Sequence, residues 1–414
     1  MAILVRLYRK MITLEENFAK DHNPFILFHY ITSCYGIRYD ASSRVFRAKL
    51  WLYVLGMVLI GSFSHKVYWS LAHTGHNFSL FCVLSTLWIM VGTVCRSMIF
   101  YRPVLVRLER FLSDRSFRGE DESNRTARWL VKRQNNRYLV AVLVTLLLEM
   151  GIFVGTNVPS QPDFMLVYNG EPIGGFATQM LYGCVSCYFG SLYIIIFAFI
   201  FVILNVFREE MSILVQSFGR IDECFDKYRS FFDGPVRSAA REREFWEELH
   251  NLLKMNVQRH VELLENLSEF RSIVGPFSCI QYYGSFVLIA YYCFVMTNFG
   301  VTKLTVIYVA FIILLVVESY MFCHSIDIIN DLHARIGSTL CELKWHTQLR
   351  YSVRFASQYR QIRKSILIIL MRTQTPIPFT INGFGMISMG RFVDLMNSSY
   401  SFLTLLLQLK RKGY

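Results

Sequence analysis

The sequence lacks the residue patterns that many enzymes and metalloproteins share. Its 10 histidines include no His-Glu-x-x-His or comparable metal-binding spacing. No paired nucleophile and base and no glycine-rich phosphate loop stand out either. Cysteine is missing from every connection expected outside the cell, so no disulfide framework is implied. These absences give no support to an enzymatic activity, and no cofactor is expected.

Charged residues are scarce in seven long stretches, and 53% of all residues are hydrophobic. That share exceeds the usual composition of a soluble domain. A helix of roughly 20 apolar residues crosses a bilayer core. The sequence therefore predicts an all-α membrane protein with seven spans. We place them at about Ala48–Phe63, Phe78–Phe100, Leu139–Val158, Gln179–Phe207, Ile273–Met296, Thr302–Phe322 and Met386–Leu409.

The N-terminal segment "MAILVRLYRK" has arginines where a signal peptide would need an apolar core. We therefore expect the first span to act as its own insertion signal. Lys and Arg gather in four segments, at 1–49, 102–137, 208–271 and 335–372, which hold 36 of the 43. The positive-inside rule then predicts a cytoplasmic N-terminus and, after seven crossings, an extracellular C-terminus. A G-protein-coupled receptor has the opposite orientation.

The net charge of +13 is spread over these cytoplasmic segments. It indicates topology and attraction to lipid headgroups, and it is poor evidence for nucleic-acid binding. Within the spans, Glu149 is the one acid well inside the third stretch, and such residues are candidates for function. It could orient a ligand, pair with another subunit or stay neutral in a hydrogen bond. Arg96 and Glu318, near cytoplasmic ends, could pair with each other.

Two cytoplasmic segments have the spacing of amphipathic helices. Apolar residues recur at steps of three and four from Arg241 to Phe270, which predicts a helix continuous with the fifth span. A second helix is expected over Ile329–Met371. The two could pack together, or lie flat on the inner leaflet. Pro376 and Pro378 end the second helix before the last span begins.

The last stretch has a polar stripe. Steps of three and four residues return to one face of a helix. From Arg391 they reach Asp394, Ser398, Ser401, Leu405, Gln408 and Lys412, and Phe392, Leu395, Phe402 and Leu406 lie opposite. Several copies with this stripe turned inward could line a channel with Leu405 as its apolar constriction. The alternative is that these polar groups form hydrogen bonds within a packed bundle.

Three segments carry a resemblance to known proteins. "SFLTLLLQLK" resembles the C-terminal signature of insect gustatory receptors, with Ser401, Phe402 and Leu409 substituted. "TQTPIPFTINGFGMISMGRFVDLMNSSYSFLTLL" looks more like the C-terminus of insect odorant receptors. "VQRHVELLENLSEFRSI" resembles the segment before their fifth span. The chain is therefore similar to the insect odorant receptor family.

The resemblance implies a tetrameric, odorant-gated, nonselective cation channel in the plasma membrane of sensory neuron dendrites. In that family the last helix lines the pore. An aliphatic residue three before a glutamine closes it, and these two match Leu405 and Gln408. A ligand-binding subunit assembles there with a co-receptor that has a long insertion between spans four and five. The corresponding segment Arg208–Arg271 is short, so this chain resembles the ligand-binding subunit. The alternative is a gustatory-type channel that needs no co-receptor.

The resemblance also implies a pocket for a small, volatile, apolar ligand in the outer half of the membrane, between spans two and six. The residues that we expect there are Phe81, Leu84, Ser85, Met150, Gly151, Phe153, Val154, Tyr182, Tyr188, Tyr291, Tyr292 and Tyr308. Aromatic walls with a few hydroxyl groups suit such a ligand. The alternative is that most of these side chains have only a structural role and pack the helices together.

The expected organisation has four regions. Residues 1–47 form a cytoplasmic segment, and residues 48–328 hold spans one to six with the ligand pocket and the inner-loop helices at 208–271. A cytoplasmic helix and a break follow at 329–385, and the pore-lining helix with a short extracellular tail occupies 386–414. Membrane lipid and the co-receptor are the expected partners besides the ligand.

Overall fold

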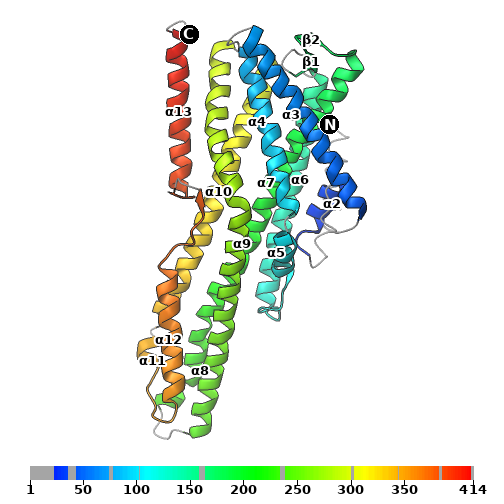
Figure 1. The fold of residues 1–414 in the computed structure, drawn as a ribbon. Coiled ribbons are helices and arrows are strands. Elements are labelled where there is room, and N and C mark those ends of the chain that lie inside the picture. Colours follow the sequence, from blue (N-terminus) through cyan, green and yellow to red (C-terminus); the bar gives the residue numbers. More distant parts are fainter. Residues whose placement is uncertain are drawn as a thin grey trace, which may run out of the picture.

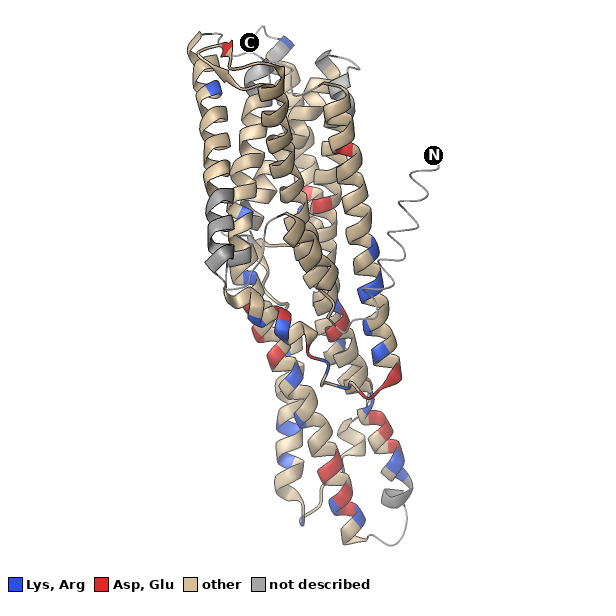
Figure 2. Ribbon diagram, turned by 90° about the vertical axis from the view of Figure 1, so that its right-hand side faces the viewer, with Lys and Arg blue, Asp and Glu red and all other residues tan. Residues whose placement is uncertain are grey.

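The structure is a computed structural model. It describes residues 23–35, 43–73, 78–101, 103–157, 164–233, 238–299, 303–343, 345–381 and 385–411. The chain forms one elongated bundle of helices, with α8, α11 and α12 at one end and α13 beside the other end (Figure 1). The Lys, Arg, Asp and Glu residues gather in the half that holds α8, α11 and α12, and they are sparse in the other half (Figure 2). This segregation fits a bundle with one half in lipid.

The described helices are α2 (Ile26–Cys34), α3 (Ser43–His73), α4 (Phe78–Ser97), η1 (Met98–Tyr101), α5 (Pro103–Ser113), α6 (Glu122–Gly155), α7 (Phe176–Gly219), α8 (Ile221–Asp233), α9 (Ala239–Phe299), α10 (Lys303–Glu342), α11 (Trp345–Gln348), α12 (Ala356–Thr373) and α13 (Met389–Arg411). Two short antiparallel hairpins complete the described structure. They pair β1 (Val167–Tyr168) with β2 (Glu171–Pro172) and β3 (Thr380–Ile381) with β4 (Gly385–Met386).

α7 is the centre of the bundle. Its most apolar window is 72% buried, whereas that of α6 is only 11% buried. From Leu192 to Leu204 nearly every residue of α7 is buried, whichever way it points. A helix that is apolar on all sides must be enclosed by others. α4, α6, α9 and α10 pack around it, so the outer face of α6 is left for lipid.

Three helices of the described part are long and apolar enough to cross a membrane, within 122–155, 176–229 and 308–348. A fourth is added if the two arms of α9 count as one bent span. The first, second and seventh expected stretches fall in α3, α4 and α13, which are helical but shorter or less uniformly apolar. The chain is a multi-pass membrane protein, and seven spans with a cytoplasmic N-terminus stay predictions.

The cytoplasmic helix expected before the fifth span is part of α9, as the sequence predicted. α9 is one helix whose arms Ala239–Pro276 and Gln281–Thr297 meet at 44°. Pro276 explains the bend, because it has no N–H to donate and its ring crowds the preceding turn.

The prediction of a single helix over Ile329–Met371 is wrong. α10 continues through Glu342, and after a break the chain returns as α12, which packs against α10 and α9. Ile362, Ile366 and Ile369 of α12 are buried in this contact. One straight helix would leave that apolar face uncovered, so burial favours the turn. The last helix likewise begins at Met389, because Met386 lies in β4.

A pair of histidines is buried where α9 and α10 extend beyond their expected spans. The rings of His260 and His333 lie 5.2 Å apart, and both residues are at most 3% exposed. Nε2 of His260 and both ring nitrogens of His333 have no hydrogen-bond partner among the described residues. Burial, then the charge of His333 and that of Arg372, lower the pKa of His260 to about 4. Burial and then the charge of Arg372 lower the pKa of His333 to about 4.

We predict that acid destabilises this packing. An unfolded histidine has a pKa of about 6.5. Because the folded pKa is lower, the stabilisation is complete above about pH 6.5 and is lost as the pH falls toward 4. The melting temperature of the purified chain should therefore decline between pH 7 and pH 5. Replacing both residues, His260→Leu with His333→Leu, should flatten this decline, and an unchanged slope would contradict the prediction.

Candidate functional site

A cavity of about 150 Å³ lies between α4, α6, α7, α9 and α10, toward the end of the bundle opposite α8 and α12. Most residues that line it are aliphatic or aromatic. They are Ser85, Thr86, Ile89, Met90, Leu146, Glu149, Met150, Ile152, Phe153, Phe164, Ser186, Cys187, Gly190, Ser191, Ile194, Tyr292, Tyr308, Ala310 and Phe311. An engineered apolar cavity of this volume binds a benzene-sized molecule, so the space suits a small ligand.

Aromatic rings form two walls of this cavity. On one side the ring of Tyr292 stacks on that of Tyr308 at 5.0 Å and lies 6.1 Å from that of Phe311. On the other side Phe153 of α6 meets Phe164 edge to face at 5.6 Å. Phe164 comes from the connection that follows α6, so a loop completes the enclosure. Such walls bind an apolar ligand by buried area and dispersion.

Few polar groups face the cavity with free hydrogen-bonding capacity. The hydroxyls of Ser186 and Ser191 donate to the carbonyls of Tyr182 and Tyr188 on their own helix. The half-buried carboxyl of Glu149 makes no hydrogen bond or ion pair with the described residues. It is thus available to accept a hydrogen bond from a molecule in the cavity.

The space itself comes from small side chains. Ser186 and Gly190 lie one turn apart on the face of α7 that lines the cavity. A Cβ atom added at Gly190 would meet no heavy atom within 4 Å, so this glycine faces open volume. Larger residues here would fill the cavity.

The structure brings five of the expected pocket residues to this cavity and leaves the others elsewhere. Those that line it are Ser85, Met150, Phe153, Tyr292 and Tyr308. Those at other places are Leu84, Gly151 and Val154, which are exposed on outer helix faces, and Tyr182, Tyr188 and Tyr291. Phe81 belongs to α4, but its side chain is outside the described residues.

Three tyrosines have partners that explain their positions. The hydroxyl of Tyr182 lies 2.6 Å from that of Ser62 on α3. Tyr188 donates to the carbonyl of Tyr35 at 2.6 Å and stacks on its ring. Tyr291 is buried in the same apolar cluster as Tyr292 and Tyr308, but it is not among the residues that line the cavity. The sequence prediction selected mainly aromatic residues and therefore missed the small residues Ser186 and Gly190 of α7. Their spacing of four residues was the signal that could have identified them.

α13 presents its polar stripe outward. Asp394, Ser398, Ser401, Leu405 and Gln408 are all exposed, Leu405 to 48%. The other side packs against α9 and α10 and buries Leu395 and Ser399. The part of the chain that the structure describes therefore leaves this stripe uncovered.

The stripe borders an open groove of about 710 Å³ between α9 and α13. Tyr282 and Tyr283 form its α9 side. Phe402, expected opposite the stripe, also borders the groove while its ring packs 6.1 Å from that of Phe286. Its ring is half-buried, so it lies at the edge of the packed face.

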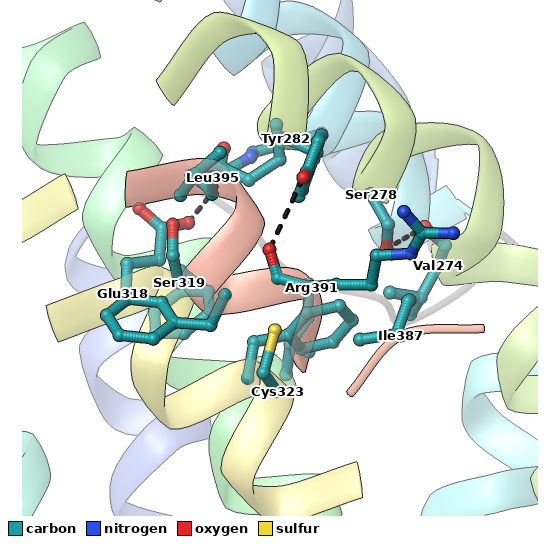
Figure 3. Close-up of a pocket in the computed structure, with 15 residues that line it drawn as sticks. Val274, Ser278, Tyr282, Glu318, Ser319, Cys323, Ile387, Arg391 and Leu395 are labelled. Atoms are coloured by element: carbon teal, nitrogen blue, oxygen red, sulfur yellow. Dashed lines mark hydrogen bonds and ion pairs between the residues drawn. The ribbon is translucent and has the colours of Figure 1, made fainter. Parts of the chain in front are cut away.

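A smaller cavity of about 40 Å³ lies beneath α13, where α7, α9 and α10 meet its first turns (Figure 3). The hydroxyl of Tyr282 donates to the carbonyl of Arg391 across it, at 3.3 Å. The backbone N–H of Met389 donates to Asp327 of α10 at 2.7 Å. These bonds attach the beginning of α13 to both α9 and α10.

The expected pair of Arg96 and Glu318 is confirmed. Nη2 of Arg96 lies 2.5 Å from Oε1 of Glu318, and both side chains are buried. The guanidinium also donates to Gln281 and to the carbonyl of Tyr193, and it lies 3.6 Å from the Tyr193 ring centroid. One ionic group thus joins α4, α7, α9 and α10 beside this smaller cavity.

The cavity residues and α13 are in contact through one layer of side chains. Met396 of α13 packs against the apolar cluster that includes Tyr292 and Tyr308. Met396 thus connects α13 to the apolar cluster that supplies the tyrosine wall.

Comparisons with known proteins give two findings. A family model described as 7tm Odorant receptor matches residues 75–400. Among solved structures, the olfactory receptor OR5 from the insect Machilis hrabei is similar at a TM-score of 0.67 and 11% identity, over 89% of this chain and 90% of that one. The same receptor in complex with eugenol is similar at a TM-score of 0.66 and 11% identity, over 98% of this chain and 99% of that one. No curated protein matches.

Proposed function

The chain belongs to the insect odorant receptor family, and from this premise we propose that it is the ligand-binding subunit of an odorant-gated, nonselective cation channel. The observation that carries the proposal is the uncovered polar stripe of α13. A polar face that no other part of the described chain covers needs water or a partner subunit. Four such helices around one axis would give both.

In this proposal the ring of Leu405 side chains is the closed gate. An apolar constriction excludes water and ions until it widens. Ser398 and Ser401 lie before it on the stripe and Gln408 after it, so they would offer polar groups to hydrated ions on either side. Asp394, near the beginning of α13, pairs with Arg391 at 3.2 Å, so its carboxylate would favour cations only in part.

The ligand would occupy the cavity walled by Tyr292, Tyr308 and Phe153. Its volume and aromatic lining support a small volatile molecule. Glu149 would accept a hydrogen bond from a ligand that carries a donor. The insect receptor solved in complex with eugenol supports this class of ligand.

The partner in this proposal is a co-receptor subunit. Between α7 and α9 the structure describes only the short helix α8, so the long insertion that marks a co-receptor has no room here. We predict odorant-evoked cation current when this chain and a co-receptor are expressed together, and none from this chain alone. The measurement is whole-cell current against a panel of volatiles. Robust current without the partner would favour the gustatory-type alternative.

Two neighbouring tyrosines test the cavity. Tyr292→Ala should raise the odorant concentration for half-maximal current at least tenfold, because the ring contributes to the cavity wall. Loss of a buried aromatic ring costs about 3–5 kcal/mol, and about 1.4 kcal/mol is tenfold in affinity. Tyr291→Ala is the matched control, since this ring is buried outside the cavity. It should lower surface expression with little change in sensitivity, and equal shifts in both variants would move the ligand elsewhere.

A second pair of variants tests the pore. Leu405→Ser should wet the constriction and raise the resting current without odorant, in part only, since partner subunits keep their own apolar side chains. Phe402→Ser should instead weaken packing against Phe286 and lower expression. Leak current is compared after normalisation to surface protein. Leak from Phe402→Ser but not from Leu405→Ser would mean that the other face lines the pore.

A further inference from the structure

A second cluster of buried charges lies at the inner end of the bundle, unrelated to the cavity and to α13. Arg128 of α6 donates from Nε and Nη2 to the carboxylate of Glu210 on α7, at 2.6 Å and 3.0 Å. Arg259 of α9 donates to the same carboxylate at 2.8 Å. All three side chains are at most 4% exposed. Arg259 also pairs with the exposed Glu262 at 3.4 Å, so Glu210 is the one buried carboxylate that the two arginines share among the described residues.

Some donors of this cluster are unused. Nη2 of Arg128 also reaches the carbonyl of Phe117, at 2.9 Å, but its Nη1 has no partner among the described residues. Nε of Arg259 is also buried without one. An unpartnered N–H of a buried charged group is costly, so such a group calls for an acceptor.

Arg128 is also one of the residues that line a small cavity of about 10 Å³. Arg115 and Lys132 line it together with Glu209 and Glu210. The half-buried Arg115 makes no hydrogen bond or ion pair with any described residue. Burial lowers its pKa, and so does the positive charge of Arg128, whereas Glu210 raises it. Three cationic side chains and two carboxylates line the cavity, so positive charge is in excess there. The volume holds about one oxygen atom.

The position of this cluster along the membrane normal indicates which kind of anion can reach it. Glu209 and Glu210 follow directly after the expected span Gln179–Phe207, and Arg128 and Lys132 precede the expected span at Leu139–Val158. With the orientation that the Lys and Arg distribution predicts, this is the level of the inner-leaflet headgroups. Anionic headgroups concentrate there, and arginine binds phosphate through paired N–H groups.

We propose that Arg115 and Arg128 form a phosphate-binding site for an anionic lipid headgroup of the inner leaflet. One phosphate oxygen enters the small cavity toward Nη1 of Arg128, and Arg115 closes over the remaining oxygens. The phosphate supplies the acceptor that Arg128 lacks and offsets the excess positive charge. The bound lipid then joins α6 to the segment between α5 and α6.

The test uses the purified full-length chain in detergent and a fluorescent dioctanoyl phosphatidylinositol phosphate as the probe. Arg115→Gln should weaken its binding about tenfold or more, because a hydrogen bond to a charged group is lost. Arg115 has no partner among the described residues, so the variant should keep the wild-type melting temperature. Arg229→Gln is the matched control: it removes one exposed positive charge from α8, where Arg229 pairs with Asp226. It should bind as the wild type does.

Competitors distinguish the sources of phosphate. If unlabelled dioctanoyl phosphatidylinositol phosphate displaces the probe far better than soluble inositol phosphate does, the site takes a lipid. Equal displacement supports a site for a free phosphate compound on the same residues. Dioctanoyl phosphatidylcholine should compete poorly. No saturable binding by the wild type, or equal losses in Arg115→Gln and Arg229→Gln, would overturn the proposal.

Discussion

The absence of a polar face on the membrane part of α7 is the constraint on which the rest of the bundle depends. Because Leu192–Leu204 is apolar in every direction, four helices must surround it. Each of the four then needs only one face that fits α7, and the opposite face can meet lipid. The weak burial of α6 follows from this arrangement. So does the position of the 150 Å³ cavity, which occupies the place where α7 has Ser186 and Gly190 instead of large side chains.

Apolar contact alone would let such helices slide along one another, and polar groups that follow the apolar part of α7 fix their register. Asn205 donates to Asn135 of α6 at 2.9 Å, and Glu210 binds arginines from α6 and α9. Separating a buried charge from its partner is far more costly than shifting an aliphatic contact. The same principle applies near α13, where Arg96 and Glu318 join α4 to α10. Both clusters are therefore fixed points around which the outer ends of the helices can adjust.

α9 and α10 take part in both functions that we propose. Their outer ends contribute Tyr292 and Tyr308 to the cavity, and α13 is attached to their middle parts through Arg391 and Met389. The bend at Pro276 lies between the arm Ala239–Pro276 and the arm Gln281–Thr297 of α9. α9 packs against α8 and α12 as well as against α13. A ligand that moves the arm with Tyr292 would thus act on α13 through the same helix.

The sequence by itself determined the helical class, the family, the continuity of α9 and the stripe on α13. These follow from local periodicity and from the distribution of charge, which are properties of the chain read in order. Even the pair of Arg96 and Glu318 could be inferred, because two opposite charges in apolar stretches at one depth need each other. The stripe could be predicted because its residues lie on one helix at steps of three and four.

Only the tertiary structure decided which residues line the cavity and that the chain turns back as α12. It also decided that Glu210 binds arginines from two helices. The cavity exists only where side chains from five helices leave space unfilled, so the positions of all five must be known. Only then is it clear that Gly190 faces open space and that Tyr182 lies against Ser62. The turn before α12 depends on an apolar surface that α9 and α10 create together. Sequence spacing along one helix has no information on the rotation of its neighbours, and that rotation selects which side chains meet.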